Sequence, residues 1–460
     1  MAAIGRKTDT WGSKYGFIMA AVGSSVGLGN FWRFPFTAGE NGGGAFIIIY
    51  LLCVLLFGLP ILMAEYALGR KSGRSAIDGV KYLAAEEGKS SAWVVLGWVG
   101  SLAAFGILTF YMVISAWIVD FIPQAFSGSF KGFTAESSGE NFGAAISNKP
   151  RIIMWLGLFI AFNTFILARG VKGGIEKAAS ILMPIFFLLL VGIVGFSLIR
   201  GDAAAAANFL LAPDFSAVTF ETYLAAVGQA FFSIGVGSCL MITYGAYLSR
   251  DTNIANSSVV VAGADTLVAM IAGFAIFPIV FAFGVDPAGG AGLFFATLPI
   301  AFGQMPAIVG GAFFVLALFA ALTSSISLME VGVSWLEDRN NLGRPKAAII
   351  TGSVLFVIGL AYVFNGDLID YIDFLTGQIL LPLGGILVCI FAGWVLSRET
   401  LATEFDNPTV LAVWSFACRF VVPPAVAFIL VFGALQTAQS NGWILLPEFL
   451  HGLLPPPAGG

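Results

Sequence analysis

One stretch of sequence, Gly23-Ser24-Ser25-Val26-Gly27-Leu28-Gly29-Asn30, interrupts the first long hydrophobic run of the chain, Tyr15 to Trp32. Its glycines lower the cost of unwinding a helix, and its serines and asparagine place polar side chains at membrane depth. A second interruption, Ser233-Ile234-Gly235-Val236-Gly237-Ser238, lies in the run Thr222 to Ser249. Small residues often serve only to let membrane helices pack closely. Polar groups and neighbouring aromatics accompany the glycines in both runs, which favours two broken helices that line a polar cavity.

The remaining sequence is that of a membrane protein. Of its 460 residues, 58% are hydrophobic and only 10% are charged. Apolar runs long enough to cross a bilayer recur along it, and the long region after Pro287 resembles an external loop before a span that starts near Pro306. Eleven spans are predicted. The other nine follow residues 41–64, 92–119, 152–168, 178–199, 266–285, from about 306, 347–366, 374–397 and 410–437.

The two interrupted spans are the first and the sixth, which is the relationship expected of an inverted repeat of five plus five helices. We therefore expect a single all-α transporter domain over residues 1–460. Its first repeat would cover about 14–200, its second about 216–397, and an eleventh helix about 410–437.

The positive residues predict the orientation. With the N-terminus inside, sixteen of the 22 Lys and Arg fall on the cytoplasmic side, which agrees with the positive-inside rule. No cleaved signal peptide is expected, because Arg6, Lys7 and Lys14 lead into a span without a small-residue cleavage pattern. A multi-pass protein of the plasma (inner) membrane follows, surrounded by lipid and without a nucleic-acid partner.

Cysteine and histidine usage argues against an enzyme. Cys53, Cys239, Cys389 and Cys418 lie in hydrophobic runs without paired spacing, so neither a disulfide framework nor a metal site is indicated. His451 is the only histidine. Because no nucleophile and base pair or cofactor motif appears, a membrane-embedded enzyme is a poor hypothesis.

Two charges inside predicted spans need partners. Arg33 could pair with one of the acidic residues at the entry to the tenth span, Asp367, Asp370 or Asp373, or could instead extend its head group to the interface. Asp265 in the seventh span requires a cation, a proton or another partner. Ala320, Thr323 and Ser324 bring a carbonyl and two hydroxyls to neighbouring turns, which suits an alkali cation or simple hydrogen bonding between helices.

Several motifs give the chain a strong resemblance to the neurotransmitter:sodium symporter family with its LeuT-type fold. The first-helix motif VGLGNFWRFP (26–35), followed by ENGGGAF (40–46), is the most specific of them. Weaker matches extend the similarity over most of the chain: EYALGR (65–70), QAFFS (229–233), TYGAY (243–247), LTSS (322–325) and LED (336–338).

The resemblance implies two sodium sites. The first would use Ser25, Asn30, Ser233, Asp265 and the substrate carboxylate; the second would use the carbonyls of Gly23, Val26 and Ala320 with the hydroxyls of Thr323 and Ser324. Family members that require chloride carry asparagine and serine where this chain has Asp265 and Ala269. Chloride is therefore not expected to be needed.

The resemblance also implies where substrate binds. Its carboxylate would meet the Leu28 and Gly29 amides and the Tyr111 hydroxyl, because free N–H groups at a half-helix end favour an anion. Monoamine carriers have an aspartate at the position of Gly27, so glycine favours an amino acid. Gly235 and Ser238 are small, which indicates room for a bulky hydrophobic or aromatic side chain unless another side chain fills the gap. The remaining pocket residues would be Ser25, Ile107, Phe232, Ser233, Ser324 and Leu328.

Gates and a release device are implied as well. The outer gate would be Arg33 with Asp373, supported by Gln229 and Phe232. The inner gate would involve Trp11, Tyr247 and Asp338, although Thr8 stands where the family has an arginine, and Arg6 or Lys7 could substitute with Glu330 nearby. Gly174 and Pro184 would allow helix five to unwind, or would produce a static kink.

We therefore expect a sodium-coupled symporter that imports neutral, hydrophobic or aromatic L-amino acids by alternating access. A non-transporting amino-acid sensor of the same fold would share every binding residue, and a carrier of a different small amino acid is a further alternative.

Overall fold

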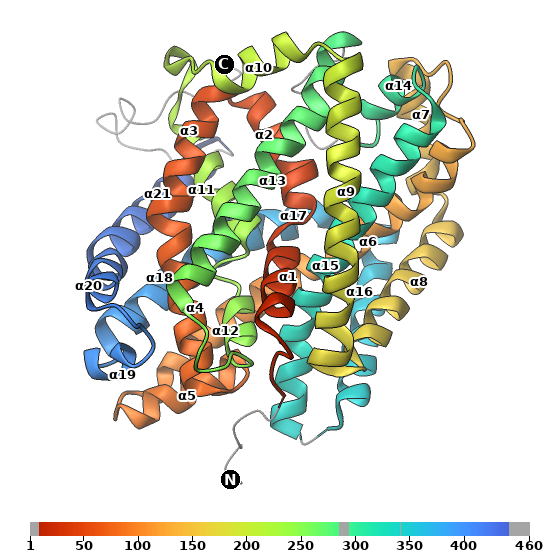
Figure 1. Ribbon diagram of the computed structural model, residues 1–460. Coiled ribbons are helices and arrows are strands. Elements are labelled where there is room, and N and C mark those ends of the chain that lie inside the picture. The colour runs from red at the N-terminus through yellow and green to blue at the C-terminus, as the bar shows by residue number, and fades with distance from the viewer. Residues whose placement is uncertain (1–8, 285–293, 341, 441–460) are drawn as a thin grey trace.

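The computed structural model describes residues 9–284, 294–340 and 342–440, and these residues form helices and connecting loops without strands (Figure 1). Nine helical segments in this part of the chain are long and apolar enough to cross a membrane. They are Gly44–Ser72 (α3, η2, α4), Ser91–Phe126 (η3, α6), Lys149–Leu167 (α8), Val171–Arg200 (η4, α9), Ile254–Ala282 (α13), Ala307–Arg339 (within α15, Ala307–Asn340), Arg344–Phe364 (α16), Leu368–Val395 (α17, η7, α18, η8) and Pro408–Gly433 (α20, η9 and part of α21, Val422–Ser440).

Two further spans are interrupted helices. The first consists of α1 (Lys14–Ser25), η1 (Gly29–Arg33) and α2 (Phe34–Glu40), and the sixth consists of α11 (Phe220–Ile234) and α12 (Leu240–Gly245). Because each half is too short to count as a continuous span, these two add to the nine, and the predicted total of eleven agrees with the structure.

The seventh helix extends beyond its charge-free run and contains Asp265, as the sequence predicts. It starts at Ile254, whereas the charge-free run starts at Thr266. The difference arises because the buried Asp265 lies inside the helix, so a criterion based on uncharged residues stops at it.

The breaks have local causes. Helix α1 ends where Val26 adopts an extended conformation, with ψ of 95°. In the sixth span, Gly235 and Gly237 take φ values of 76° and 82°, a left-handed region that only glycine adopts readily. The buried Glu65 carboxylate of α4 (Leu59–Ser72) accepts hydrogen bonds from the Gly237 and Met241 amides at 2.6 and 3.1 Å. These bonds satisfy N–H groups that the break leaves without helical partners.

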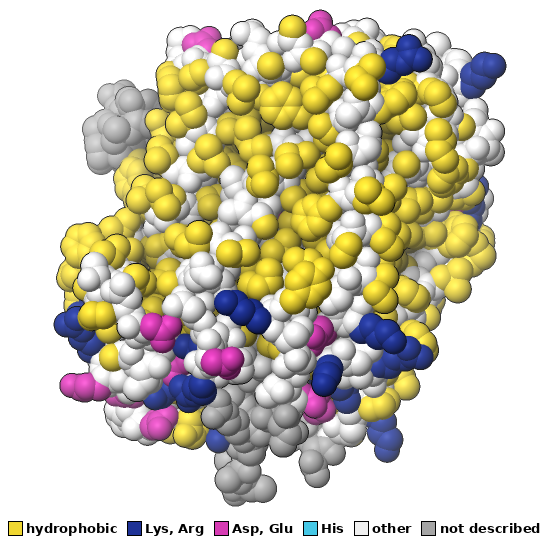
Figure 2. Space-filling view, viewed as in Figure 1, with side chains coloured by type: hydrophobic (Ala, Val, Ile, Leu, Met, Phe, Trp, Pro, Cys, Tyr) yellow, Lys and Arg dark blue, Asp and Glu magenta, His cyan; other side chains and the backbone are white. Residues whose placement is uncertain are grey.

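The surface matches a protein that crosses a membrane. Figure 2 shows a broad hydrophobic band across the middle of the molecule, with Lys, Arg, Asp and Glu gathered toward the two ends. The lower end carries most of the charge in this view, and it is where α1 begins and where the short helix α5 (Ala76–Glu86) lies (Figure 1). Lys71 and Arg74 precede α5 and Lys81 lies within it, so this end is assigned to the cytoplasm.

Short helices outside the spans cap the bundle. They are α7 (Ala135–Ser147), α10 (Ala203–Leu211), α14 (Leu298–Phe302) and α19 (Arg398–Ala402). Helix α14 lies in the region that the sequence predicts as an external loop with short helices before the eighth span.

Candidate functional site

The two broken helices meet at their interruptions. The Ser25 hydroxyl donates to the Ile234 carbonyl at 3.2 Å, and the Gln229 amide donates to the Gly29 carbonyl at 3.0 Å. Both contacts are buried. The polar groups that the interruptions release therefore face one another in the interior of the bundle.

Asp265 is the charged centre of this region. Its side chain is fully buried, and it accepts hydrogen bonds from Asn30 Nδ2 at 2.9 Å and from Ser233 Oγ at 2.8 and 3.1 Å. These two donors are neutral, so they do not cancel the charge of an ionised carboxylate. Carboxylate, hydroxyl and amide oxygens from Ser25, Asn30, Ser233 and Asp265 are a hard donor set, and that set fits an alkali cation beside the carboxylate.

A second group of oxygens lies between α1 and α15. Ser324 Oγ donates to the Gly23 carbonyl at 3.4 Å, and Thr323 Oγ1 donates to the Ala320 carbonyl at 3.2 Å. The helices approach closely, since a Cβ added to Gly23 would lie 3.2 Å from Thr323 Cβ. Val26, the residue that follows α1, is buried. This donor set contains no charged group and also fits a monovalent cation.

A cavity lined by serines of both oxygen groups, Ser25, Ser233 and Ser324, lies beside them. Every residue that the sequence analysis places in the substrate pocket lines it. Ser24, Gly27 and Leu240 line it in addition, and of these Ser24 and Leu240 carried no substrate signal in the sequence. The predicted residues are Ser25, Leu28, Gly29, Ile107, Tyr111, Phe232, Ser233, Gly235, Ser238, Ser324 and Leu328.

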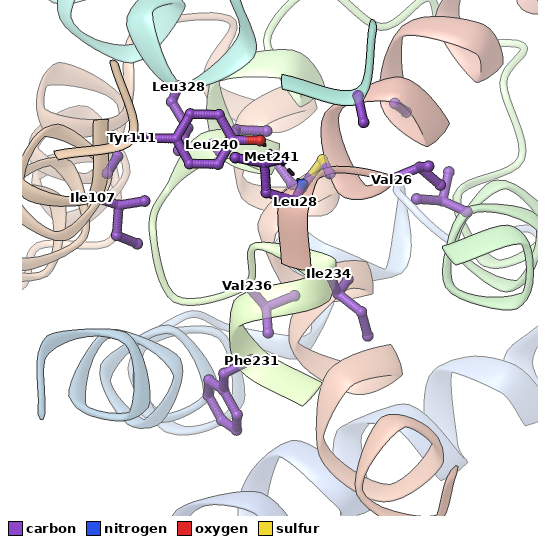
Figure 3. Close-up of a cluster of buried hydrophobic side chains, with 14 of the residues drawn as sticks. Val26, Leu28, Ile107, Tyr111, Phe231, Ile234, Val236, Leu240, Met241 and Leu328 are labelled. Atoms are coloured by element: carbon purple, nitrogen blue, oxygen red, sulfur yellow. Dashed lines mark hydrogen bonds between the residues drawn. The ribbon is translucent and has the colours of Figure 1, made fainter. Parts of the chain in front are cut away.

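The cavity has a polar end and an apolar end. Leu28 N–H donates to the Tyr111 hydroxyl at 3.2 Å, as the dashed line in Figure 3 shows. Leu240, Leu328 and Ile107, which Figure 3 also labels, line the same cavity with apolar side chains. A ligand with one polar and one apolar end therefore matches the cavity.

Two glycines control the space in the cavity. A Cβ on Gly27 would lie 2.4 Å from Ser324 Oγ and 3.1 Å from the Tyr111 hydroxyl, so a side chain there would require Ser324 to move. A Cβ on Gly235 would meet nothing within 4 Å. The sequence analysis explained Gly235 by pocket size, and its positive φ of 76° adds a backbone reason.

On the outer side, Arg33 lies beside the acidic tenth span. Its Nη1 is 3.3 Å from Asp373 Oδ1, and its guanidinium carbon lies 4.4 Å from the centre of the Phe232 ring. Of the three aspartates considered, the ion pair forms with Asp373. Arg33 thus joins Asp373 to Phe232, which lines the cavity, and Gln229 contacts Gly29 of the same wall.

On the cytoplasmic side, Trp11 contacts α12. Its indole N–H donates to the Tyr244 carbonyl at 3.2 Å, and its backbone N–H donates to the Tyr247 carbonyl at 3.3 Å. The Asp338 carboxylate accepts from the Ser75 amide at 2.7 Å. The predicted substitutes for the missing arginine, Arg6 and Lys7, lie outside the described residues together with Thr8.

The cation that pairs with Glu330 was not predicted from the sequence. The Tyr247 hydroxyl donates to Glu330 Oε1 at 2.6 Å, and Arg344 Nη2 lies 2.5 Å from Glu330 Oε2. Arg344 also donates to the Leu167 carbonyl. It stands fourteen positions after Glu330, beyond a turn, where no helical spacing signals a contact.

Helix five begins with an irregular turn. Gly174 lies in the wide π-helical turn η4 (Val171–Glu176), and Pro184 lies inside α9 (Lys177–Arg200). The Glu176 carboxylate accepts from the Gly12 amide at 2.6 Å and the Ser13 hydroxyl at 2.9 Å. Glu176 was not predicted, and it connects this turn to the segment that carries Trp11.

Arg419, for which the sequence suggests no partner, has one in the structure. Its Nε donates to the Gly393 carbonyl, and its guanidinium lies 6.0 Å from the Trp394 ring centre. The four cysteines are free, although the Cys389 and Cys418 sulfur atoms lie 3.6 Å apart between α18 (Leu381–Ile390) and η9 (Ala417–Val421).

Comparison with known proteins agrees with this geometry. The model of the Sodium:neurotransmitter symporter family matches residues 8–138 and 133–449. The uncharacterized sodium-dependent transporter YhdH of Bacillus subtilis is 37% identical over 447 residues, which cover 93% of this chain and 97% of that protein. An uncharacterized sodium-dependent transporter of Haemophilus influenzae is 34% identical over 458 residues, covering 94% and 99%. The crystal structure of MhsT in complex with L-phenylalanine superposes with a TM-score of 0.86 at 38% identity, covering 92% of this chain and 99% of that one.

The chain belongs to the sodium:neurotransmitter symporter family. It is accordingly a multi-pass membrane protein with the LeuT-type fold, a sodium-dependent transporter and not an enzyme.

Proposed function

We propose that the protein is a sodium-coupled symporter that imports neutral L-amino acids with bulky hydrophobic or aromatic side chains. The observation that carries this proposal is the two-ended cavity, where the Leu28 amide and the Tyr111 hydroxyl lie 3.2 Å apart at the polar end. Both groups can donate to a substrate carboxylate, and the N-terminal side of η1 adds a favourable dipole.

Two sodium ions are proposed to bind with the substrate. The first takes Ser25, Asn30, Ser233 and Asp265, and the second takes Gly23, Val26, Ala320, Thr323 and Ser324. In this scheme the substrate carboxylate completes the coordination of the first sodium ion. Bound sodium therefore raises the affinity for the substrate, and bound substrate raises the affinity for sodium by the same factor. Asp265 supplies a fixed negative charge beside the first ion, and Ala269 offers no hydroxyl, which together support transport without chloride.

The substrate's size class rests on the apolar end. Gly235 leaves open space where its side chain would project, and Ser238 turns its hydroxyl back onto the Gly235 carbonyl at 2.5 Å. MhsT was crystallised with L-phenylalanine, which supports the size class. The sodium-dependent nutrient amino acid transporter 1 of Drosophila grimshawi, 25% identical over 93% of this chain and 76% of its own, supports an amino-acid substrate without indicating its size.

Transport requires that the cavity open to one side at a time. We assign the outer gate to Arg33 and Asp373, with Phe232 and Gln229, and the inner gate to Trp11, Tyr247 and Asp338. Release toward the cytoplasm would use the irregular start of helix five, where Gly174 and Pro184 weaken helical hydrogen bonding.

The decisive experiment is uptake of labelled L-leucine by the purified protein in liposomes. We expect an inward sodium gradient to drive accumulation, and potassium in its place to abolish it. Unlabelled tryptophan and tyrosine should compete, whereas lack of competition by either would contradict the large-pocket assignment. Sodium-dependent binding without uptake would instead identify a sensor.

A further inference from the structure

A buried carboxylate on the cytoplasmic side lies outside the substrate and sodium sites. Glu404 follows α19 in the connection to α20 (Pro408–Phe416), and its side chain is 0% exposed. Its Oε2 lies 2.7 Å from Arg70 Nε, and its Oε1 lies 2.6 Å from Arg250 Nη1. One buried anion is thus shared by two arginines from distant parts of the chain.

Arg70 contacts both neighbouring loops. It lies in the last turn of the helix α4, and besides the ion pair it donates to the Glu404 carbonyl at 2.7 Å and to the Thr252 carbonyl. Thr252 and Arg250 belong to the turn between α12 and α13. The carboxylate and its two arginines therefore connect the end of α4, the end of α12 and the segment between α19 and α20. We call this cluster the Glu404 clasp.

Further contacts fasten the same segment. Asn253 Nδ2 donates to Asp406 Oδ2 at 2.7 Å, and the Ser397 and Thr400 hydroxyls donate to the Glu87 carboxylate at the end of α5. Helices α4, α5, α12 and α19 lie at the same end of the molecule in Figure 1. The segment 397–406 thus contacts the end of α4, the end of α5 and the turn between α12 and α13 on the cytoplasmic side.

The helices that the clasp joins are in direct backbone contact. A Cβ on Gly69 of α4 would lie 2.0 Å from the Ile242 carbonyl oxygen of α12, and a Cβ on Gly245 would lie 2.8 Å from the Tyr66 carbonyl oxygen. Such an interface has no side-chain layer that could slide or repack. Helix α12 also carries Tyr244, and Tyr247 follows it two residues after its end; the carbonyls of both accept hydrogen bonds from Trp11.

We propose that Glu404 is a positioning residue that holds the inner half-helix α12 to α4 during transport, so that the two move as one body. The proposal extends the alternating-access function proposed above and rests on it. The physical reason is electrostatic: removal of the shared anion leaves two cations facing each other, one of them buried, and breaking a buried ion pair from one side is strongly unfavourable. Arg250 is 52% exposed, so water screens its share of the clasp more than that of Arg70, which is 3% exposed.

The test is amide hydrogen exchange of the purified, full-length protein, followed by mass spectrometry. In Glu404→Gln, exchange over residues 240–253 should accelerate by about tenfold or more, whereas α15 should be unchanged. Arg250→Gln should give a smaller change of the same sign, and it remains informative if Glu404→Gln fails to fold. Glu404→Asp should restore part of the protection. Glu399→Gln, an exposed carboxylate in the same segment, is the matched control.

A transport measurement separates positioning from plain stability. We expect Glu404→Gln to slow sodium-driven uptake several-fold while equilibrium substrate binding in saturating sodium stays within about twofold. Acceleration spread evenly over all helices, or unchanged exchange over residues 240–253, would overturn the proposal. Because hydrogen exchange requires no transport, absence of uptake by the unmodified protein would count against the proposed function and leave the clasp intact.

Discussion

Asn30 Nδ2 lies 2.9 Å from Asp265 Oδ1, and Asn30 Oδ1 accepts the Gly27 amide at 2.9 Å. One side chain therefore connects the buried carboxylate of the seventh helix to the unwound backbone that lines the cavity. We expect a change in charge at Asp265 to affect the polar end of the pocket through Asn30. This continuity is the physical route by which sodium and substrate would affect each other's binding.

The first prediction concerns chloride. Uptake by the unmodified protein should be the same when gluconate replaces chloride, because Asp265 supplies the negative charge. Asp265→Asn should raise the half-saturating sodium concentration by about tenfold or more, since a full charge beside a cation is lost at membrane depth. Adding Ala269→Ser to Asp265→Asn should make the remaining uptake chloride-dependent. Collapse of wild-type transport in gluconate would refute the assignment.

The second prediction concerns the substrate carboxylate. Tyr111→Phe should weaken amino-acid binding by about 10- to 100-fold, because a hydrogen bond to a charged group contributes about 1.5–3 kcal/mol. Equilibrium binding of labelled leucine in saturating sodium measures the change. Tyr371→Phe removes a hydroxyl from a side chain that is 71% exposed, and it should bind as the unmodified protein does. Equal affinity in the two variants would remove Tyr111 from the site.

The third prediction separates size from charge at Gly27. Gly27→Ala should weaken amino-acid binding, because its Cβ would lie 2.4 Å from Ser324 Oγ. Gly27→Asp should weaken it by a further tenfold or so, because two carboxylates would then face each other in a water-poor cavity. Equilibrium binding of labelled leucine to the unmodified protein, Gly27→Ala and Gly27→Asp measures the order of their affinities. If the aspartate variant bound as well as the alanine variant, the substrate carboxylate would lie elsewhere.

The fourth prediction distinguishes unwinding of helix five from a static kink. Proline inside a helix removes one hydrogen bond and costs about 3 kcal/mol, so Pro184→Ala should raise the melting temperature. If the helix unwinds during release, the same variant should slow turnover several-fold with sodium and substrate affinities within about twofold. Pro278→Ala, in the interior of α13, is the control, and it should not slow turnover. Unchanged turnover in Pro184→Ala would identify a static kink.

The sequence predicts much of the architecture because the relevant signals are local. The eleven spans follow from apolar runs of bilayer length, and both breaks follow from glycines beside polar residues. Gly235 and Gly237 adopt the positive φ values that such an interruption requires. The seventh helix starts at Ile254, before its charge-free run, because the buried Asp265 interrupts that run within the predicted span.

The pocket residues could be predicted from the family resemblance and not from local sequence signals. Tyr111, Phe232 and Ser324 come from three helices, and composition alone does not bring them together; the resemblance of their motifs to the family did. Ser24 and Leu240 line the same cavity but carry no distinguishing chemistry, so only the packing of the helices reveals them.

By itself, the sequence determined the membrane environment, the orientation and the positions of the two broken helices, since each depends on residues close together in the chain. The tertiary structure alone decided the charge partners. Arg33 faces Asp373 across 340 positions, and Arg70 faces Glu404 across 334. The Glu330 carboxylate accepts hydrogen bonds from both Arg344 and Tyr247. Ion pairs act over a few ångströms in space whatever the separation along the chain, so the sequence can indicate that a buried charge needs a partner, whereas the fold selects which partner it has.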